Sequence, residues 1–185
     1  VGLAGFALGL ITTTTVLKQI FAPIMGLALL FALYHRHSYT GCKPAMTDVI
    51  AGATALMAEV NGIEKVPHVK EKLAELICTS ELCYGTGIAA AINSHRDASG
   101  TYIPDIMYCN VSRRHAGLNI YHEYDILADI AGGMPSTMPR PRDWVSEDTR
   151  PFIEKYMARN PEVDVQDAIR AFAWVQAISC SEWSG

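Results

Sequence analysis

Two long stretches of helical pattern constrain the fold of this chain most, because each has a clear start and a clear stop. Pro67 opens the first, which continues from His68 to about Asn93. Pro104-Asp105 opens the second, which runs through Ile130 and ends at Gly132-Gly133. Proline fits the first turn of a helix and glycine its end, so both stretches are predicted as long helices. The apolar stripe of the first is expected to comprise Val69, Leu73, Leu76, Ile77 and Leu82.

Two further helices are expected before Pro67. One is predicted over Ile24 to Tyr39. Thr47 then offers an N-cap for a second helix over Asp48 to Val60, and Asn61-Gly62 gives that helix a stop signal.

The rest of the chain alternates connections and shorter helices. Ser94 to Tyr102 is polar and predicts an exposed loop. Shorter helices are expected over Thr149 to Ala158 and over Val165 to Ser179. A rigid, irregular connection without helix is predicted from three prolines, Pro135, Pro139 and Pro141. No strand pair is expected, so the sequence predicts an all-α helical bundle, in which cofactor sites are built from side chains on facing helices.

Composition narrows the classes of function. Half of the 185 residues are hydrophobic and only 18% are charged, which indicates large faces buried against something else. A net charge of −4 without a basic stripe gives no reason to expect nucleic acid. Five cysteines, an odd number without a regular framework, favour a reducing compartment, and we expect a cytoplasmic protein. The chain begins with Val1, as expected of a piece of a longer protein.

The first 34 residues are almost free of charge. Val1 to Leu17 and Ile20 to Tyr34 carry none, and only Lys18 and Gln19 lie between them. Each run is shorter than the ~20 residues that span a bilayer, and no basic segment precedes it as in a signal peptide. Buried helices are therefore the preferred interpretation and no membrane is expected, with membrane association as the alternative.

Four chemically capable side chains lie in the short segment that ends at Lys43. At about 100° per residue on a helix, Tyr39 lies roughly 40° from His35, and Cys42 lies roughly 20° away on the other side. His35, Tyr39 and Cys42 would share one face of the helix, with Lys43 at its margin and His37 pointing roughly opposite. On an inner helix of the bundle, this row would face the neighbouring helices and any cofactor between them.

The spacing of His35 and Cys42 restricts what they could bind together. Residues seven apart on a helix are about 10.5 Å apart along its axis, whereas a single zinc ion prefers ligands three or four apart. Two full turns suit a larger body with several metal atoms, such as an iron–sulfur cluster. The competing interpretation is that both side chains merely pack.

Several segments carry a resemblance to a known family. They are His35-Arg36-His37-Ser38-Tyr39-Thr40-Gly41-Cys42-Lys43, Asp48-Val49-Ile50-Ala51-Gly52-Ala53, Tyr84-Gly85-Thr86-Gly87-Ile88-Ala89, Ser99-Gly100-Thr101-Tyr102 and Asp129-Ile130-Ala131-Gly132-Gly133-Met134. These segments resemble the 4-hydroxybutyryl-CoA dehydratase family, within the superfamily of the 4-hydroxyphenylacetate 3-hydroxylases. The resemblance covers roughly Phe31 to Tyr156 and implies a helical bundle like the C-terminal domain of acyl-CoA dehydrogenases.

The resemblance also implies two cofactors, FAD and a four-iron four-sulfur cluster. His35 and Cys42 would be two of the four cluster ligands. The family's other two ligands are a Cys-x-x-x-Cys pair in a preceding region. No such pair exists here, since Cys78 and Cys83 are five apart and lie downstream. The two further ligands and the flavin-binding middle domain are thus expected from upstream sequence.

The family removes water from 4-hydroxybutyryl-CoA to give crotonyl-CoA, with a related isomerisation of vinylacetyl-CoA, and the resemblance implies three catalytic residues. His35 would hold the cluster iron and act as a base once displaced. Tyr39 would donate a hydrogen bond to the substrate hydroxyl or to a radical intermediate, and Lys43 would place positive charge near the thioester carbonyl or the polar groups of the acyl-CoA. The Gly132-Gly133 turn and Thr137 would lie near the flavin, where small residues permit close approach.

Each of these roles has a structural competitor. Tyr39 could satisfy a buried partner, Lys43 could be a helix-end cation, and the two glycines could be a plain helix stop. Arg113 is expected to be a solvated helix charge rather than a phosphate ligand. Packed thiols are expected at Cys78, Cys83, Cys109 and Cys180.

The chain is expected to comprise a divergent apolar extension, residues 1–22, and the C-terminal helical domain of a longer enzyme, residues 23–185. An acyl-CoA substrate and a homo-oligomer are expected, and this piece alone is expected to be inactive. Two alternatives stay open. One is an FAD-dependent aromatic hydroxylase, which does not need the His and Cys ligands. The other is a catalytically silent helical domain that only associates with partner subunits.

Overall fold

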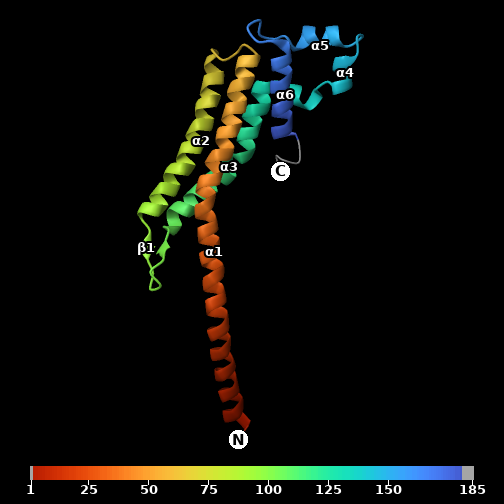
Figure 1. Ribbon diagram of the computed structural model, residues 1–185. Coiled ribbons are helices and arrows are strands. Elements are labelled where there is room, and N and C mark those ends of the chain that lie inside the picture. Colours follow the sequence, from red (N-terminus) through yellow and green to blue (C-terminus); the bar gives the residue numbers. More distant parts are fainter. Residues whose placement is uncertain (1, 181–185) are drawn as a thin grey trace.

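The computed structural model of the chain describes residues 2–180 and shows three long helices that pack side by side (Figure 1). They are α1 (Gly2–Val60), α2 (Pro67–Ile92) and α3 (Ile106–Ala131). α2 runs back along α1, and α3 then runs in the same direction as α1. The all-α bundle predicted from the sequence is confirmed.

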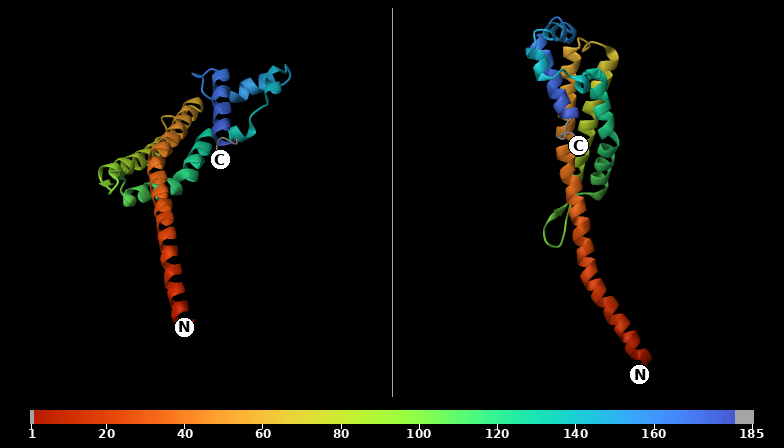
Figure 2. Two further views of the ribbon diagram at one scale, coloured as in Figure 1. Left: turned by 60° about the horizontal axis from the view of Figure 1, so that its bottom comes forward. Right: turned by 90° about the vertical axis from the view of Figure 1, so that its right-hand side faces the viewer.

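The shorter elements cover one end of this bundle (Figure 2). They are η1 (Met134–Thr137), α4 (Pro141–Val145), α5 (Arg150–Met157) and α6 (Val165–Ser179). The two C-terminal helices lie within one residue of their predicted bounds. The connection between Gly133 and α5 was expected to hold no helix, and this is wrong. Pro135 and Pro141 stand in the first turns of η1 and α4, where a missing N–H costs nothing.

A short antiparallel strand pair joins α2 to α3, so the prediction of no strand pair is wrong. β1 (His95–Arg96) pairs with β2 (Tyr102–Ile103). Between them, the Asp97 carboxylate accepts hydrogen bonds from the backbone N–H of Ser99 and of Thr101. These contacts close the loop. The Ser99 hydroxyl also donates to the carboxylate, and it is the main cause that holds the pKa of Asp97 below its usual range.

Local signals set the ends of the long helices as predicted. Asp105 caps α3 by accepting hydrogen bonds from the N–H groups of Met107 and Tyr108. Gly132 ends α3 with φ +69°, a left-handed conformation that favours glycine. Asn61 follows α1 and donates from Nδ2 to the Ile130 carbonyl at 2.8 Å, which ties the ends of α1 and α3 together.

Helix α1 is continuous through the segment where a new helix start was expected, so the N-cap predicted at Thr47 is wrong. Thr47 is fully buried inside α1, more than three turns before its end, and its hydroxyl lies 3.1 Å from the Lys43 carbonyl, one turn back. Pro44 also lies inside the helix, where it leaves the Thr40 carbonyl without its usual N–H partner. Packing on both sides of α1 carries the helix across this weak point.

Toward its N-terminus α1 leaves the bundle (Figure 1). Large apolar side chains there are more than half exposed, among them Ile20, Phe21, Ile24 and Leu27. The stretch Lys18–Val60 is the one helical stretch among the described residues that is long and apolar enough to cross a membrane. A single such helix is weak evidence for a membrane span. The large apolar side chains from Ile20 to Phe31 are exposed, so the preferred interpretation of buried helices is wrong for this part of the segment. The predicted extension, residues 1–22, lies largely outside the residues whose side chains are described.

The core of the bundle follows a spacing of seven residues on each long helix. Buried side chains recur at Leu33, Thr40, Thr47 and Thr54 on α1, at Val69, Leu76, Cys83 and Ala90 on α2, and at Cys109, Ala116, Glu123 and Ile130 on α3. Such spacing keeps one face of each helix turned toward its neighbours when helices cross at shallow angles.

This spacing corrects the apolar stripe predicted on α2. Val69 and Leu76 are fully buried and Leu73 is half-buried, as expected. Ile77 and Leu82 are each 56% exposed, so their place on the stripe is wrong. The stripe continues instead through small side chains, which let α1 and α2 approach closely.

Helices α1 and α2 approach each other closely at Gly87. A Cβ atom built on Gly87 would lie 2.6 Å from the Cβ and 2.2 Å from the Oγ1 of Thr40. Gly85, two residues earlier on the same helix, has nothing within 4 Å of such an atom. The two glycines therefore differ in packing while sharing helical conformation.

We expect Gly87→Ala to destabilise the chain by about 1–3 kcal/mol, because Thr40 and its backbone must move to admit the methyl group. Gly85→Ala is the matched control and should be neutral or stabilising by up to about 1 kcal/mol, since alanine favours helix. Denaturant unfolding followed by circular dichroism measures both. Equal effects of the two substitutions would contradict the close contact.

Candidate functional site

The predicted row of side chains lies where α1 enters the bundle, and its backbone is helical throughout. His37 Nε2 lies 3.3 Å from the Gly87 carbonyl on α2, so His37 points away from the row as predicted. His35 and Cys42 are exposed. The expectation that the row faces the neighbouring helices is therefore wrong for these two residues.

The two candidate metal ligands make few contacts with the rest of the chain. The His35 ring stacks on Phe31 of the preceding turn, with centroids 5.9 Å apart and planes at 11°. The Cys42 thiol lies 3.7 Å from the Tyr39 carbonyl, to which it donates. His35 thus lies on a face of α1 that neither α2 nor α3 covers, and Cys42 lies at the edge of that face toward α3.

Lys43, predicted at the margin of the row, is buried against α3. Its ammonium Nζ lies 2.5 Å from Oε2 of Glu123, and only 3% of Lys43 and 1% of Glu123 are exposed. Thr47 Oγ1 lies 3.0 Å from the same carboxylate oxygen. The interpretation of Lys43 as a helix-end cation is wrong, because the residue lies in the middle of α1 and in a buried ion pair.

Tyr39 is half-buried between the exposed ligands and the Lys43 pair. The guanidinium carbon of Arg113 lies 4.8 Å from the centroid of its ring, so Arg113 is more than the solvated charge expected. Burial raises the pKa of the Tyr39 phenol, and the Arg113 charge partly opposes this. The phenol is consequently protonated at neutral pH and able to donate a hydrogen bond.

A small cavity of about 110 Å³ joins three of the predicted residues. It is lined by Tyr39, Cys42, Lys43, Met46 and Ile50 of α1 and by Ile120 and Tyr124 of α3. Since a water occupies roughly 30 Å³ of liquid, the cavity takes a few waters or one small group rather than an acyl chain. His35 lies outside this lining.

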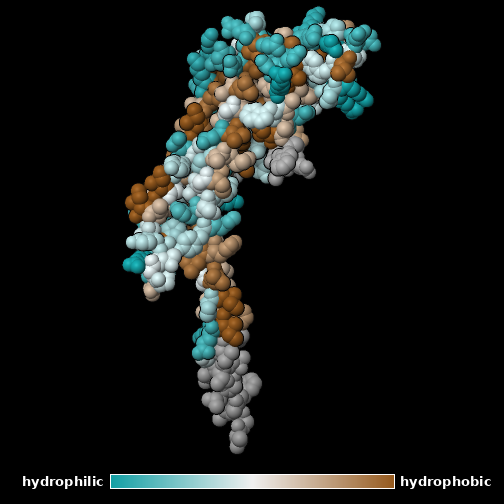
Figure 3. Space-filling view, in the orientation of Figure 1, coloured by the Kyte–Doolittle hydropathy of each residue, from teal (hydrophilic) through white to brown (hydrophobic). Residues whose placement is uncertain are grey.

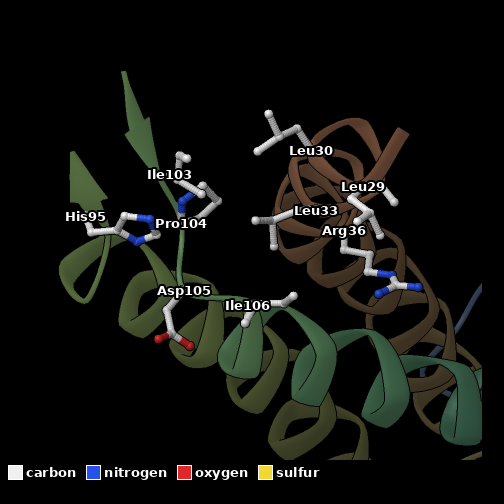
Figure 4. Close-up of a pocket in the computed structure, with 10 residues that line it drawn as sticks. Leu29, Leu30, Leu33, Arg36, His95, Ile103, Pro104, Asp105 and Ile106 are labelled. Atoms are coloured by element: carbon white, nitrogen blue, oxygen red, sulfur yellow. The ribbon is translucent and has the colours of Figure 1, made fainter. Parts of the chain in front are cut away.

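A larger cavity of about 440 Å³ lies at the other end of the α1–α3 contact (Figure 4). Its walls are mainly aliphatic, with Leu33 facing Ile103 and Ile106, and Arg36 and His95 lie at its edge. Arg36 Nη1 donates to Asn110 Oδ1 at 2.6 Å. None of the residues predicted to be catalytic, to bind the flavin or to bind a metal lines this cavity.

The residues predicted for the flavin lie at the end of α3. Gly132 and Gly133 have φ +69° and +74°, and the predicted helix stop is confirmed. Gly133 lines a shallow cavity of about 260 Å³, whereas Thr137 lines a separate one of about 300 Å³. Gly133 and Thr137 thus line different cavities, and Gly132 lines neither of these two.

Within the described part of the chain, the candidate donors do not complete a metal site. Among the residues whose side chains are described, no three His, Cys, Asp or Glu groups come close enough to hold a metal ion. His35 and Cys42 are of the right donor type and open to ligands from elsewhere. Cys83 and Cys109 are buried as predicted, while the packing predicted for Cys78 and Cys180 is wrong, since both are exposed.

Sequence reasoning missed Glu123, Thr47 and the contact of Arg113 with Tyr39. The signal for Glu123 was available, because it stands seven residues after Ala116 and seven before Ile130 on the core face of α3. A carboxylate in such a position is rarely unpaired. Its partner Lys43, 80 residues earlier, has no signal in the sequence.

Comparison with known proteins assigns the chain to one family. Residues 25–185 match the family model described as 4-hydroxyphenylacetate 3-hydroxylase C terminal. Over 156 residues the chain is 35% identical to the 4-hydroxybutyryl-CoA dehydratase/vinylacetyl-CoA-Delta-isomerase of Clostridium aminobutyricum, which covers 80% of this chain and 32% of the relative. It is 28% identical to the 4-hydroxyphenylacetate 3-monooxygenase oxygenase component of Thermus thermophilus, over 80% of this chain and 31% of that protein. The chain spans about a third of the length of these curated relatives.

Solved structures share the fold. An oxygen-tolerant archaeal 4-hydroxybutyryl-CoA dehydratase from N. maritimus has a TM-score of 0.75 and 32% identity, over 82% of this chain and 30% of that one. The oxygenase component of 4-hydroxyphenylacetate 3-monooxygenase, complexed with FAD, has a TM-score of 0.74 and 24% identity, over 82% and 32% of the two chains. The second likeness shows the fold alone.

The five cysteines should divide into two classes of thiol reactivity. We expect Cys42, Cys78 and Cys180 to react readily with a maleimide, and Cys83 and Cys109 to be protected, because burial both excludes the reagent and raises the pKa of these two thiols. Peptide mass spectrometry of the native and the denatured chain measures each site. Cys78 is the internal control for Cys42: a reactive Cys78 beside a protected Cys42 would contradict the uncovered face of α1.

Proposed function

The chain belongs to the 4-hydroxyphenylacetate 3-hydroxylase family, and from this premise we propose that it forms the C-terminal helical domain of a longer, 4-hydroxybutyryl-CoA dehydratase-like enzyme. The proposed reaction is the dehydration of 4-hydroxybutyryl-CoA to crotonyl-CoA. One observation carries this proposal above all: continuous helix holds His35 and Cys42 on the uncovered face of α1, beside Tyr39 and Lys43. An aromatic hydroxylase of the same family has no need of this pair of ligands.

The proposed cofactors are a four-iron four-sulfur cluster and FAD. His35 and Cys42 would hold the cluster together with two ligands from outside this chain, and Gly132, Gly133 and Thr137 would lie near the flavin. When bound, the cluster supplies a Lewis-acidic iron and the flavin supplies one-electron chemistry. The exposure of both donor groups, which leaves them open to ligands from elsewhere, supports this arrangement.

The side chains beside the ligands would supply hydrogen bonds. The Tyr39 phenol is protonated, is held by Arg113 and borders the same cavity as Cys42, so it is placed to donate to the leaving hydroxyl of a substrate. Lys43 would donate from the cavity wall toward the polar end of the acyl group. His35 would serve as ligand and as proton acceptor.

The proposed partners are an acyl-CoA substrate and further copies of the same chain, in the cytoplasm. Apolar side chains gather along the outer edge of α2 (Figure 3). They are Ile77, Leu82, Tyr84, Ile88 and Ile92, each at least 44% exposed. Exposed apolar side chains of this kind support assembly.

In the full-length enzyme we expect His35→Ala and Cys42→Ala each to lose most of the bound iron and acid-labile sulfide, because each removes one of four ligands. The matched controls are His37→Ala, which lies on the opposite face of the same helix, and Cys78→Ala, an exposed thiol on α2. Both controls should keep iron and turnover near wild type. Iron and sulfide assays with the absorbance spectrum measure the result.

Other outcomes of this experiment separate the alternatives. A wild-type enzyme that binds flavin but no iron would overturn the proposal in favour of an aromatic hydroxylase. A full-length protein that binds neither cofactor and only oligomerises would indicate a silent assembly domain. Equal iron loss in the His37 control would show that the effect arises from damage to α1 rather than from a lost ligand.

A further inference from the structure

Glu123 is a carboxylate in the middle of the core face of α3. It is 1% exposed, and its neighbours one heptad away on either side are Ala116 and Ile130, both buried. An ionised carboxylate in such a place needs compensation from the protein. The compensation comes from α1, where the Lys43 ammonium lies 2.5 Å from Oε2, and the Thr47 hydroxyl lies 3.0 Å from the same oxygen.

The two donors converge on one oxygen and leave the other without a partner. Glu123 Oε1 is buried and has no hydrogen-bond partner among the described residues. The Thr47 hydroxyl also has only one proton to share between Oε2 and the Lys43 carbonyl. Buried ion pairs that serve stability alone satisfy both carboxylate oxygens, and even then apolar side chains often stabilise a core better. This pair is therefore poorly explained by stability.

The pair is better explained by where it holds Lys43. A lysine ammonium sits on a flexible four-carbon stem and takes no fixed position by itself. Lys43 lines the small cavity beside Tyr39 and Cys42, whereas Glu123 stands behind it and does not line the cavity. The carboxylate thus acts on the cavity only through Lys43.

We infer that Glu123 is a positioning residue for the site: it anchors the Lys43 ammonium at the cavity wall and neutralises its charge. The Lys43–Glu123 pair then presents a fixed hydrogen-bond donor to whatever enters beside Tyr39 and Cys42, rather than a free positive charge. This inference rests on the proposed function, in which Lys43 contacts the substrate.

A double-mutant cycle in the full-length enzyme tests this. We expect Glu123→Gln to lower kcat on the order of 10²-fold, as removal of one oriented donor does, with KM changed less than about three-fold. Lys43→Met should cost about as much. The double variant should be no worse than Lys43→Met alone, because Glu123 acts only through Lys43. Glu123→Asp, which keeps the charge, should recover much of the loss.

The matched control is Asp129→Asn, the same loss of charge on the same helix, where Asp129 pairs with Lys72 at the surface. Its kcat should stay near wild type. Losses that multiply in the double variant, or a wild-type kcat for Glu123→Gln, would overturn the inference while leaving the dehydratase proposal intact.

A second readout does not depend on turnover. Denaturant unfolding is measured for the wild type, Glu123→Gln, Lys43→Met and the double variant. Lys43→Met should lower the free energy of unfolding strongly, because it leaves the Glu123 charge buried and unpaired. The added Glu123→Gln should restore much of that loss. Restoration in an enzyme without dehydratase activity would sink the proposed reaction but support the anchoring of Lys43. Independent, additive effects on unfolding would refute the anchoring whatever the reaction.

Discussion

Helix α1 has to present three different faces at one level of the bundle, and the rest of the structure depends on that division. The angular position of each side chain around the axis of α1 can be counted from His35 at 0°, with about 100° added per residue. The side chains centred near ~85° then meet α3, and those centred near ~185° meet α2. The first comprises Arg36, Tyr39, Lys43 and Thr47, and the second comprises His37, Thr40, Pro44 and Asp48. The remaining face carries His35 and Cys42, which are both exposed.

The middle of the bundle carries more polar groups than stability alone would select. Besides the Lys43–Glu123 pair, Ser80 donates to the Asp48 carboxylate at 2.8 Å, and Ser112 donates to the Cys83 carbonyl at 3.3 Å. Polar groups at core positions lower stability relative to apolar packing but restrict the ways in which helices fit together. Of these polar groups, Lys43 lines the Tyr39 cavity, and polar groups kept in a core at a cost in stability are typical of a region selected for function.

The sequence was sufficient where structure is local. The ends of α2 and α3 depend on Pro67, Asp105 and Gly132, each of which acts within one turn, and all were predicted. The break expected at Thr47 was wrong because capping preference is a local signal, and contacts with α3 override it. The β1–β2 pair was missed because two residues per strand leave no alternation to detect.

In the candidate site, too, local features could be predicted from the sequence and contacts between distant residues could not. The shared face of His35 and Cys42 follows from helix geometry and could be predicted, since it needs only the angle per residue. The burial of Lys43 could not, because its partner is 80 residues away. Nor could the stacking of Arg113 on Tyr39, which depends on the register of α1 against α3.

That register connects the buried pair to the exposed ligands. A slip of one residue along α1 would rotate every side chain by about 100°. It would take Lys43 out of reach of Glu123 and leave the carboxylate unpaired in the core, while Thr40 would leave its place against Gly87. Apolar contacts alone tolerate such slips, whereas a buried charge pair penalises them. The contact that holds Lys43 at the cavity therefore also keeps His35 and Cys42 turned outward, toward whatever completes the site.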